Sequence, residues 1–237
     1  MFNTQHILYM VISGALTVAL LYWAAKRLQT LQRKDRFLSF FAIVTVALHY
    51  SDIWVDYFAN AGQVTVASIY ILPVYPCNMV MWMLLAAACI KDKESLPFQM
   101  LAEFCFFIGT FCGVIGILLN ENFDSTPTLA DYGVLKGLLS HSTMLVGCLY
   151  MKVGGYIRIH LRNAVSVTAG LLTFVLCGIA VNRLYDHFGM EAPDGMFLRD
   201  NPYLPCSPVL PGLCLIAVMF LVLWLVERHR KKKGLTV

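Results

Sequence analysis

The chain contains seven apolar segments that are each long enough to cross a lipid bilayer, and this limits its fold more than any other feature. A membrane-spanning helix needs about 20 predominantly apolar residues. Seven stretches of the 237-residue chain meet that length: 6–25, 37–59, 65–90, 97–119, 132–151, 164–182 and 207–226. Hydrophobic residues make up 59% of the sequence and charged residues only 14%, so little remains for a soluble domain. The sequence therefore predicts an all-α membrane protein, with one seven-helix transmembrane domain over residues 1–237.

The placement of the basic residues predicts how these helices are oriented. Of the 18 Lys and Arg residues, 15 follow the first, third, fifth or seventh segment, which puts them all on one side of the membrane. Connections rich in Lys and Arg face the cytoplasm, so we expect the N-terminus outside and the C-terminus inside. We interpret the basic tail at 228–233 as an anchor on anionic lipid rather than a nucleic-acid patch. We expect a multi-pass protein of a bacterial cell membrane that binds no nucleic acid.

Two prolines, Pro73 and Pro76, interrupt the third apolar segment near its middle. Each proline lacks an N–H group and crowds the preceding turn, so the helix is expected to break there. Broken backbone at membrane depth is tolerated where it is buried in protein or lines a cavity. Three side chains that can take part in chemistry adjoin the break: Tyr75, Cys77 and Asn78. We therefore expect the other helices to surround this stretch and the functional site to lie here.

A histidine in the fifth segment is expected at a depth similar to that of Cys77. At 1.5 Å per residue, His141 lies about 14 Å and Cys77 about 18 Å from the outer end of its own segment. An imidazole beside a thiol can accept its proton, and the thiolate is then the nucleophile. The pair predicts a cysteine nucleophile with a histidine general base. A purely structural role for His141 in helix packing is the alternative.

The second segment carries three ionisable residues, His49, Asp52 and Asp56, on one helix face, since their spacing is i, i+3, i+7. Ionisable side chains in a spanning helix are costly and usually face the bundle interior or a wet cavity. One hypothesis gives them a supporting role, in which an aspartate holds His49 or orients His141. In the other, His49 and Asp52 satisfy each other and only fasten helices together.

The outer half of the predicted bundle also carries three basic residues: Lys136, Arg183 and Arg199. Arginine and lysine bind phosphate oxygens through charge-assisted hydrogen bonds, so these three are candidates for holding a lipid phosphate. The last outer loop contains the apolar run 196–198, which is expected to dip toward the bilayer or cover the mouth of a cavity.

Three motifs, in this order along the chain, resemble signatures of the YwaF-like integral membrane family. The first is Pro73-Val74-Tyr75-Pro76-Cys77, which is similar to that family's LP-x-x-x-C pattern. The second is Ser140-His141, and the third is Asn182 followed by the residues 195–202. The chain departs from the family pattern at Asp194-Gly195, where the family has Asn-Tyr before Met-Phe-Leu.

The resemblance implies acyl-chain chemistry, because the family is related to a mammalian cysteine-dependent phospholipid acyltransferase whose cysteine and histidine match Cys77 and His141. The resemblance also includes more distant relatives that hydrolyse fatty-acid esters, so hydrolysis stays an alternative. Tyr75 or Asn78 is a candidate donor to the oxyanion, and Asn182 is a supporting residue in the third motif. No cofactor is expected, and the absence of a CxxC pair gives no support for a metal.

A non-enzymatic seven-helix receptor or transporter is the second class of function. Seven spans with the N-terminus outside suit a receptor, but the seventh segment has no lysine for a Schiff base. The line of ionisable residues in the second segment suits a proton path, but the chain shows no internal repeat. Membrane lipids are the expected partners as substrates, and the oligomeric state is left open.

Overall fold

The computed structural model describes residues 2–60, 62, 75–120, 123, 125–189, 194–199 and 209–232. All the regular structure in these ranges is helical. The elements are α1 (Thr4–Arg27), α2 (Leu31–Ala59), α4 (Pro76–Cys89), α5 (Leu96–Phe104), η1 (Cys105–Gly109), α6 (Thr110–Leu118), α8 (Tyr132–Val153), α9 (Asn163–His187), η2 (Gly195–Phe197) and α10 (Val209–Lys232).

Five of the described helices are long and apolar enough to cross a membrane: α1, α2, the continuous run Leu96–Leu118, α8 and α9. The prediction of an all-α fold built from spanning helices is thus confirmed for the part of the chain that the structure describes. The shorter α4 covers the second half of the third predicted segment, and the first half, with Pro73, lies outside the described residues. The sidedness of the termini and the single domain stay predictions.

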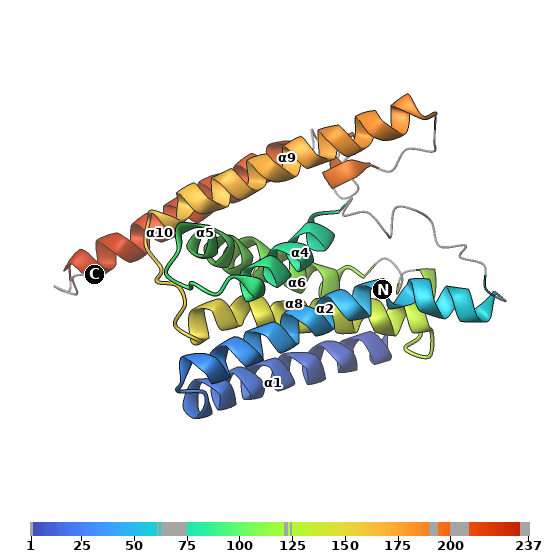
Figure 1. Cartoon of the computed structure of the whole chain (residues 1–237), viewed down its shortest axis with the longest axis horizontal. Coiled ribbons are helices and arrows are strands. Elements are labelled where there is room, and N and C mark those ends of the chain that lie inside the picture. The colour runs from blue at the N-terminus through green and yellow to red at the C-terminus, as the bar shows by residue number, and fades with distance from the viewer. Residues whose placement is uncertain are drawn as a thin grey trace.

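The helix α8 lies at the centre of the arrangement (Figure 1). It packs against α1 and α2 on one side and against α4, η1 and α6 on the other. The helices α9 and α10 run side by side along the opposite edge of the molecule and contact the rest mainly through α5. The outer faces of α1 and α9 remain apolar and exposed, as at Leu16 and Leu176, which is the pattern of a surface that faces lipid.

Small residues bring α6 and α8 into close contact. A side-chain carbon added at Gly109 would overlap Cys148, and one added at Gly113 would lie 3.0 Å from Leu145. Glycines spaced four residues apart allow helix backbones to approach closely in a membrane. These close approaches fix the position of α8 relative to η1 and α6.

The run from α5 to α6 is interrupted by one π-helical turn, η1. Just before this turn, Glu103 is buried and accepts a hydrogen bond of 2.5 Å from the Ser166 hydroxyl on α9. The acid thus lies inside the protein, where the hydroxyl satisfies a carboxyl group that would otherwise be costly to bury.

Candidate functional site

Cys77 occupies the second position of α4. The helix begins at Pro76, and Tyr75 precedes it with extended backbone angles, φ −101° and ψ 154°. Proline suits the first helical position because an amide there has no partner within the helix. The proline that interrupts the apolar segment therefore places the Cys77 thiol in the first turn of a helix. A negatively charged sulfur is stabilised at this end of a helix by the helix dipole.

Asn78 lies next to the thiol and is buried, with 4% of its surface exposed. The Cys77 sulfur donates a hydrogen bond to the Asn78 amide oxygen at 3.4 Å. The backbone amide of Asn78 also belongs to the first turn, where helical N–H groups have no acceptor within the helix. One residue thus presents both a side-chain amide and a backbone amide beside the sulfur.

His141 has its ring orientation set by its own helix. The ring nitrogen Nδ1 lies 2.8 Å from the carbonyl oxygen of Gly137. A carbonyl oxygen only accepts hydrogen bonds, so Nδ1 carries the proton in this contact and Nε2 keeps its lone pair. A side-chain carbon at Gly116 of α6 would overlap the ring around Nε2, which shows that the imidazole is packed directly on α6. This tautomer is the one that a general base using Nε2 requires.

Cys77 and His141 belong to helices that contact each other and that both contact α6, namely α4 and α8. Gly116 of α6 lies directly against the His141 ring. That the thiol and the imidazole meet stays a prediction from the sequence.

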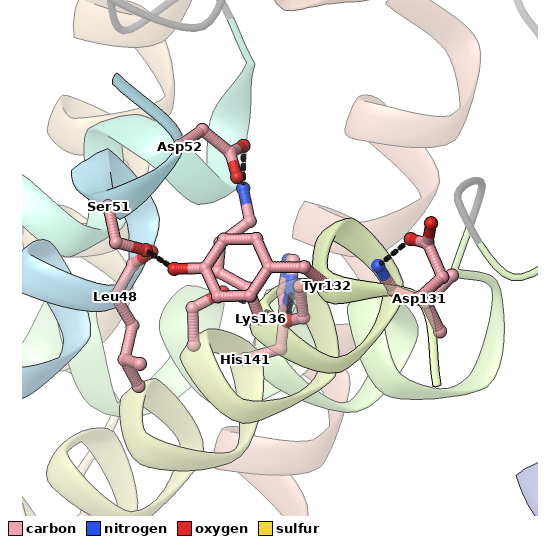
Figure 2. A network of polar contacts seen from close by, with 10 residues as sticks. Leu48, Ser51, Asp52, Asp131, Tyr132, Lys136 and His141 are labelled. Carbon is pink, nitrogen blue, oxygen red and sulfur yellow. Dashed lines mark hydrogen bonds and ion pairs between the residues drawn. The ribbon is translucent and has the colours of Figure 1, made fainter. Parts of the chain in front are cut away.

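Asp52 on α2 pairs with Lys136 on α8. The lysine on α8 forms an ion pair with the Asp52 carboxylate on α2, and the two side chains are 6% and 23% exposed. Figure 2 shows Lys136 reaching across to Asp52, with Tyr132 beside it on α8. The Tyr132 hydroxyl donates a hydrogen bond of 2.5 Å to Ser51, so two polar contacts join α2 and α8 here. Because Lys136 is already paired with the Asp52 carboxylate, the structure gives no support for its predicted role in binding a lipid phosphate.

The other ionisable residues of α2 have separate surroundings. The His49 ring lies edge-on to Tyr50 at 4.8 Å between ring centroids. The Tyr50 hydroxyl in turn accepts a hydrogen bond of 2.9 Å from Trp82 on α4. Asp56 accepts one of 2.5 Å from the Asn60 side chain. The three residues share a helix face, as their spacing predicts, but the interactions described for them run to different neighbours.

Asn182 is buried on α9 and anchors the segment 194–199. Its side-chain oxygen accepts a hydrogen bond of 2.7 Å from the Gly195 amide. Arg199 donates to the Asn182 carbonyl oxygen at 3.1 Å and to Asp186 at 2.8 Å. Within the described residues, the third motif thus joins the segment 194–199 to α9 through hydrogen bonds, which could not be predicted from the sequence alone.

The apolar residues of that segment pack on α9. Met196 is buried and lies against Gly178, where an added side-chain carbon would meet the Met196 side chain at 2.9 Å. Leu198 is partly buried beside it. The segment is thus held on the helix, and its predicted action as a cover of a cavity remains a prediction. Arg183 is exposed nearby, and within the described ranges no carboxylate pairs with it.

No group of three or more His, Cys, Asp or Glu residues in the described part of the chain is arranged to hold a metal ion. The described surroundings of the thiol are the buried Asn78 side chain and the first turn of α4. His141 lies on α8, a helix that contacts α4, and its ring is oriented by the Gly137 carbonyl oxygen.

An all-helical chain with several apolar spans, and with polar side chains gathered between them, defines an integral membrane protein. The family model described as the TMEM164 family matches residues 1–228. The chain therefore belongs to the TMEM164 family, a family of membrane proteins. No curated protein and no solved structure matches the chain.

Proposed function

We propose that this membrane protein is a lipid acyltransferase that moves fatty acyl chains between membrane lipids, with Cys77 as the nucleophile and His141 as the general base. The observation that carries the proposal is the position of Cys77 at the start of a helix, α4, inside an apolar segment. A thiol that serves only as a small apolar group needs no such environment. A catalytic thiol benefits from it, because the attacking species is the thiolate.

The reaction has two steps. In the first, Nε2 of His141 takes the thiol proton, the sulfur attacks the ester carbonyl of the donor lipid, and a C–S bond replaces the C–O bond. The proton passes from His141 to the departing alcohol. In the second, His141 takes the proton of the acceptor hydroxyl, whose oxygen attacks the thioester, and the thiol is restored.

Asn78 is the proposed donor to the oxyanion. Its side chain is already next to the sulfur, and its backbone amide lies in the first turn of α4. Donors that are held in place before reaction stabilise the charge that develops on the carbonyl oxygen. Tyr75 precedes the same turn and is the second candidate.

Arg183 is the proposed contact to the lipid phosphate. Of the three basic residues on the expected outer half, Lys136 is paired with Asp52 and Arg199 with Asp186. Arg183 is also exposed, and it has no carboxylate partner in the described ranges. Arg199 is a second contact if the phosphate displaces Asp186, since both of these side chains are exposed at the surface.

Hydrolysis is the same chemistry with water as the acceptor. A receptor or transporter, by contrast, has no need for a reactive thiol at Cys77. The deciding experiment incubates the purified protein in vesicles with a phospholipid that carries a labelled acyl chain. We expect a labelled thioester on Cys77 that neutral hydroxylamine releases, and label in a second lipid when an acceptor lysolipid is present. Label only in free fatty acid indicates hydrolysis.

The control variant is Cys177→Ser, which removes another partly buried thiol, on α9. We expect this variant to keep both the label and the turnover, whereas Cys77→Ala loses both. Full turnover in Cys77→Ala contradicts the proposed nucleophile.

A further inference from the structure

A hollow of about 410 Å³ lies between the end of α1 and the start of α2. Its lining surface is almost wholly apolar and comes from Leu20 of α1, Leu28 of the connection and three phenylalanines of α2, together with the carbon atoms of two arginines: Phe37, Phe40, Phe41, Arg33 and Arg36. The hollow is an open groove on the surface and not an enclosed pocket. It thus offers an apolar surface, and the two arginines at its lining are exposed.

The orientation of Phe37 shapes this hollow. Its ring packs on Tyr150 of α8 at 4.4 Å and on Phe41 at 4.8 Å between centroids, so the side chain is drawn toward the protein interior. Phe40, one turn along the helix, remains 59% exposed. Only three residues connect α1 to α2, which makes the helices antiparallel neighbours and places Leu20 across from these rings.

The two arginines have no carboxylate partner in the part of the chain that the structure describes. Asp35 lies between them in the sequence, but it accepts a hydrogen bond of 2.7 Å from Tyr156 on another side of α2. Other basic side chains are engaged: Lys93 donates to two carbonyl oxygens at the end of α4, and Arg230 donates to Ile159. The charge of Arg33 and Arg36 is thus available to an anion, and the start of α2 adds the positive end of its helix dipole.

We propose that this groove binds one anionic glycerophospholipid, with its phosphate between Arg33 and Arg36 and an acyl chain along Phe37, Phe40 and Phe41. Two guanidinium groups match the oxygens of a phosphate, and basic side chains at a membrane surface recognise anionic lipids. The apolar wall lies on spanning helices, where acyl chains are the surrounding medium.

This groove is distinct from the site at Cys77. Arg36 precedes Asp52, which pairs with the helix of His141, by 16 residues on α2, or about 24 Å along the helix. The groove and the polar contacts near His141 therefore lie toward opposite ends of a spanning helix. The proposed lipid therefore binds at the end of the helices where the basic connections lie. Its binding does not depend on the proposed acyl transfer.

The first test titrates the detergent-solubilised full chain with phosphatidylglycerol and, separately, with phosphatidylcholine of the same chains, and counts retained lipids by native mass spectrometry. We expect one phosphatidylglycerol to be retained per chain in preference to phosphatidylcholine. In Arg33→Gln/Arg36→Gln this affinity is expected to fall about thirtyfold, since each basic residue near an anionic headgroup contributes roughly fivefold. The control is Lys26→Gln/Arg27→Gln, which removes the same charge from the end of α1 without touching the groove, and it is expected to keep the affinity.

The second test uses the unaltered protein, so it holds even where a variant fails to fold. A phosphatidylglycerol with a photoreactive group on its acyl chain is expected to crosslink within residues 37–41. Equal retention of the two lipids, an equal loss in the control variant, or crosslinks confined to other helices would overturn the proposal. A lipid-free dimer that Phe40→Asp converts to a monomer would also overturn it, because a second copy would then fill the groove.

Discussion

Lys136 on α8 forms an ion pair with Asp52 on α2, and the lysine is nearly completely buried. Charged side chains inside a membrane protein are costly unless they are paired. The pair lies five residues before His141 on the same helix, about 7.5 Å along its axis. It therefore holds the helix that carries the proposed base against α2, and its role is to position that helix.

Removing one partner of this pair is expected to destabilise the protein more than removing both. Lys136→Met leaves Asp52 without its cation and should cost up to about 3 kcal/mol, whereas the double variant Lys136→Met/Asp52→Leu should recover most of that loss. Thermal unfolding in detergent measures both. A double variant that is no more stable than the single one would show that the unpaired Asp52 carboxylate is not what destabilises Lys136→Met.

The stability of the folded protein is expected to depend on pH through Tyr156, which lies in the connection after α8. Burial raises the pKa of Tyr156, and its hydrogen bond to the Asp35 carboxylate raises that pKa further. A pKa raised on folding means that the neutral phenol is favoured in the folded state. The stabilisation of the folded state by the neutral Tyr156 hydroxyl is fully present below the pKa of an unfolded tyrosine, about 10. This stabilisation is lost as the pH rises toward the higher pKa of the folded state.

Tyr156→Phe should accordingly be less stable than the unaltered protein at pH 8, by roughly 1.5–3 kcal/mol for a hydrogen bond to a charged group. The difference should shrink as the pH rises above about 10. Melting temperatures between pH 8 and pH 11 test this. Tyr22→Phe, at an exposed position on α1, serves as the control and should show no such trend. A difference that stays constant with pH would contradict the assignment.

The sequence predicts the spanning helices of the described ranges well, because they depend on local properties. Apolar length predicts a spanning helix, and Pro76 and Cys77, which the sequence singles out, are the first two residues of α4. His141 in the centre of α8 follows in the same way. These features need no knowledge of how the helices pack.

The partners of the polar residues could not be predicted, since they depend on packing. The spacing of His49 and Asp52 allows a pair within α2, but only the contact of α2 with α8 shows that Asp52 meets Lys136. Asn182 stands out in the sequence through its motif, but its bond to Gly195 depends on how the segment 194–199 folds back. The basic groove likewise depends on Phe37 turning toward α8.

Gly116→Ala is expected to reduce turnover by displacing His141. The added methyl group would overlap the imidazole, so the ring or the helix must shift, and overpacking of this kind costs about 1–3 kcal/mol of stability. A shift of about 1 Å at a catalytic group can reduce the rate about 100-fold. Steady-state transfer between labelled phospholipids measures the effect.

The matched control is Gly14→Ala on α1, where no atom lies within 4 Å of the added carbon. This variant should keep full turnover, because it introduces the same methyl group into a spanning helix without any neighbour to displace. Unchanged turnover in Gly116→Ala would mean that the position of the imidazole on α6 is not needed for the reaction.

Arg183→Gln should raise KM for a phospholipid more than it lowers kcat. The proposed contact is with the phosphate, which lies away from the reacting ester and is held alike in the ground state and the transition state. Loss of this contact therefore weakens binding without slowing the chemical step.

Arg162→Gln is the control, since Arg162 precedes α9 at its other end. This variant should leave both constants unchanged. Arg199→Gln should affect KM less than Arg183→Gln, because Arg199 already has Asp186 as a partner. Equal losses in kcat and kcat/KM for Arg183→Gln would instead place this arginine at the reacting carbonyl, and no change in either constant would remove it from the site.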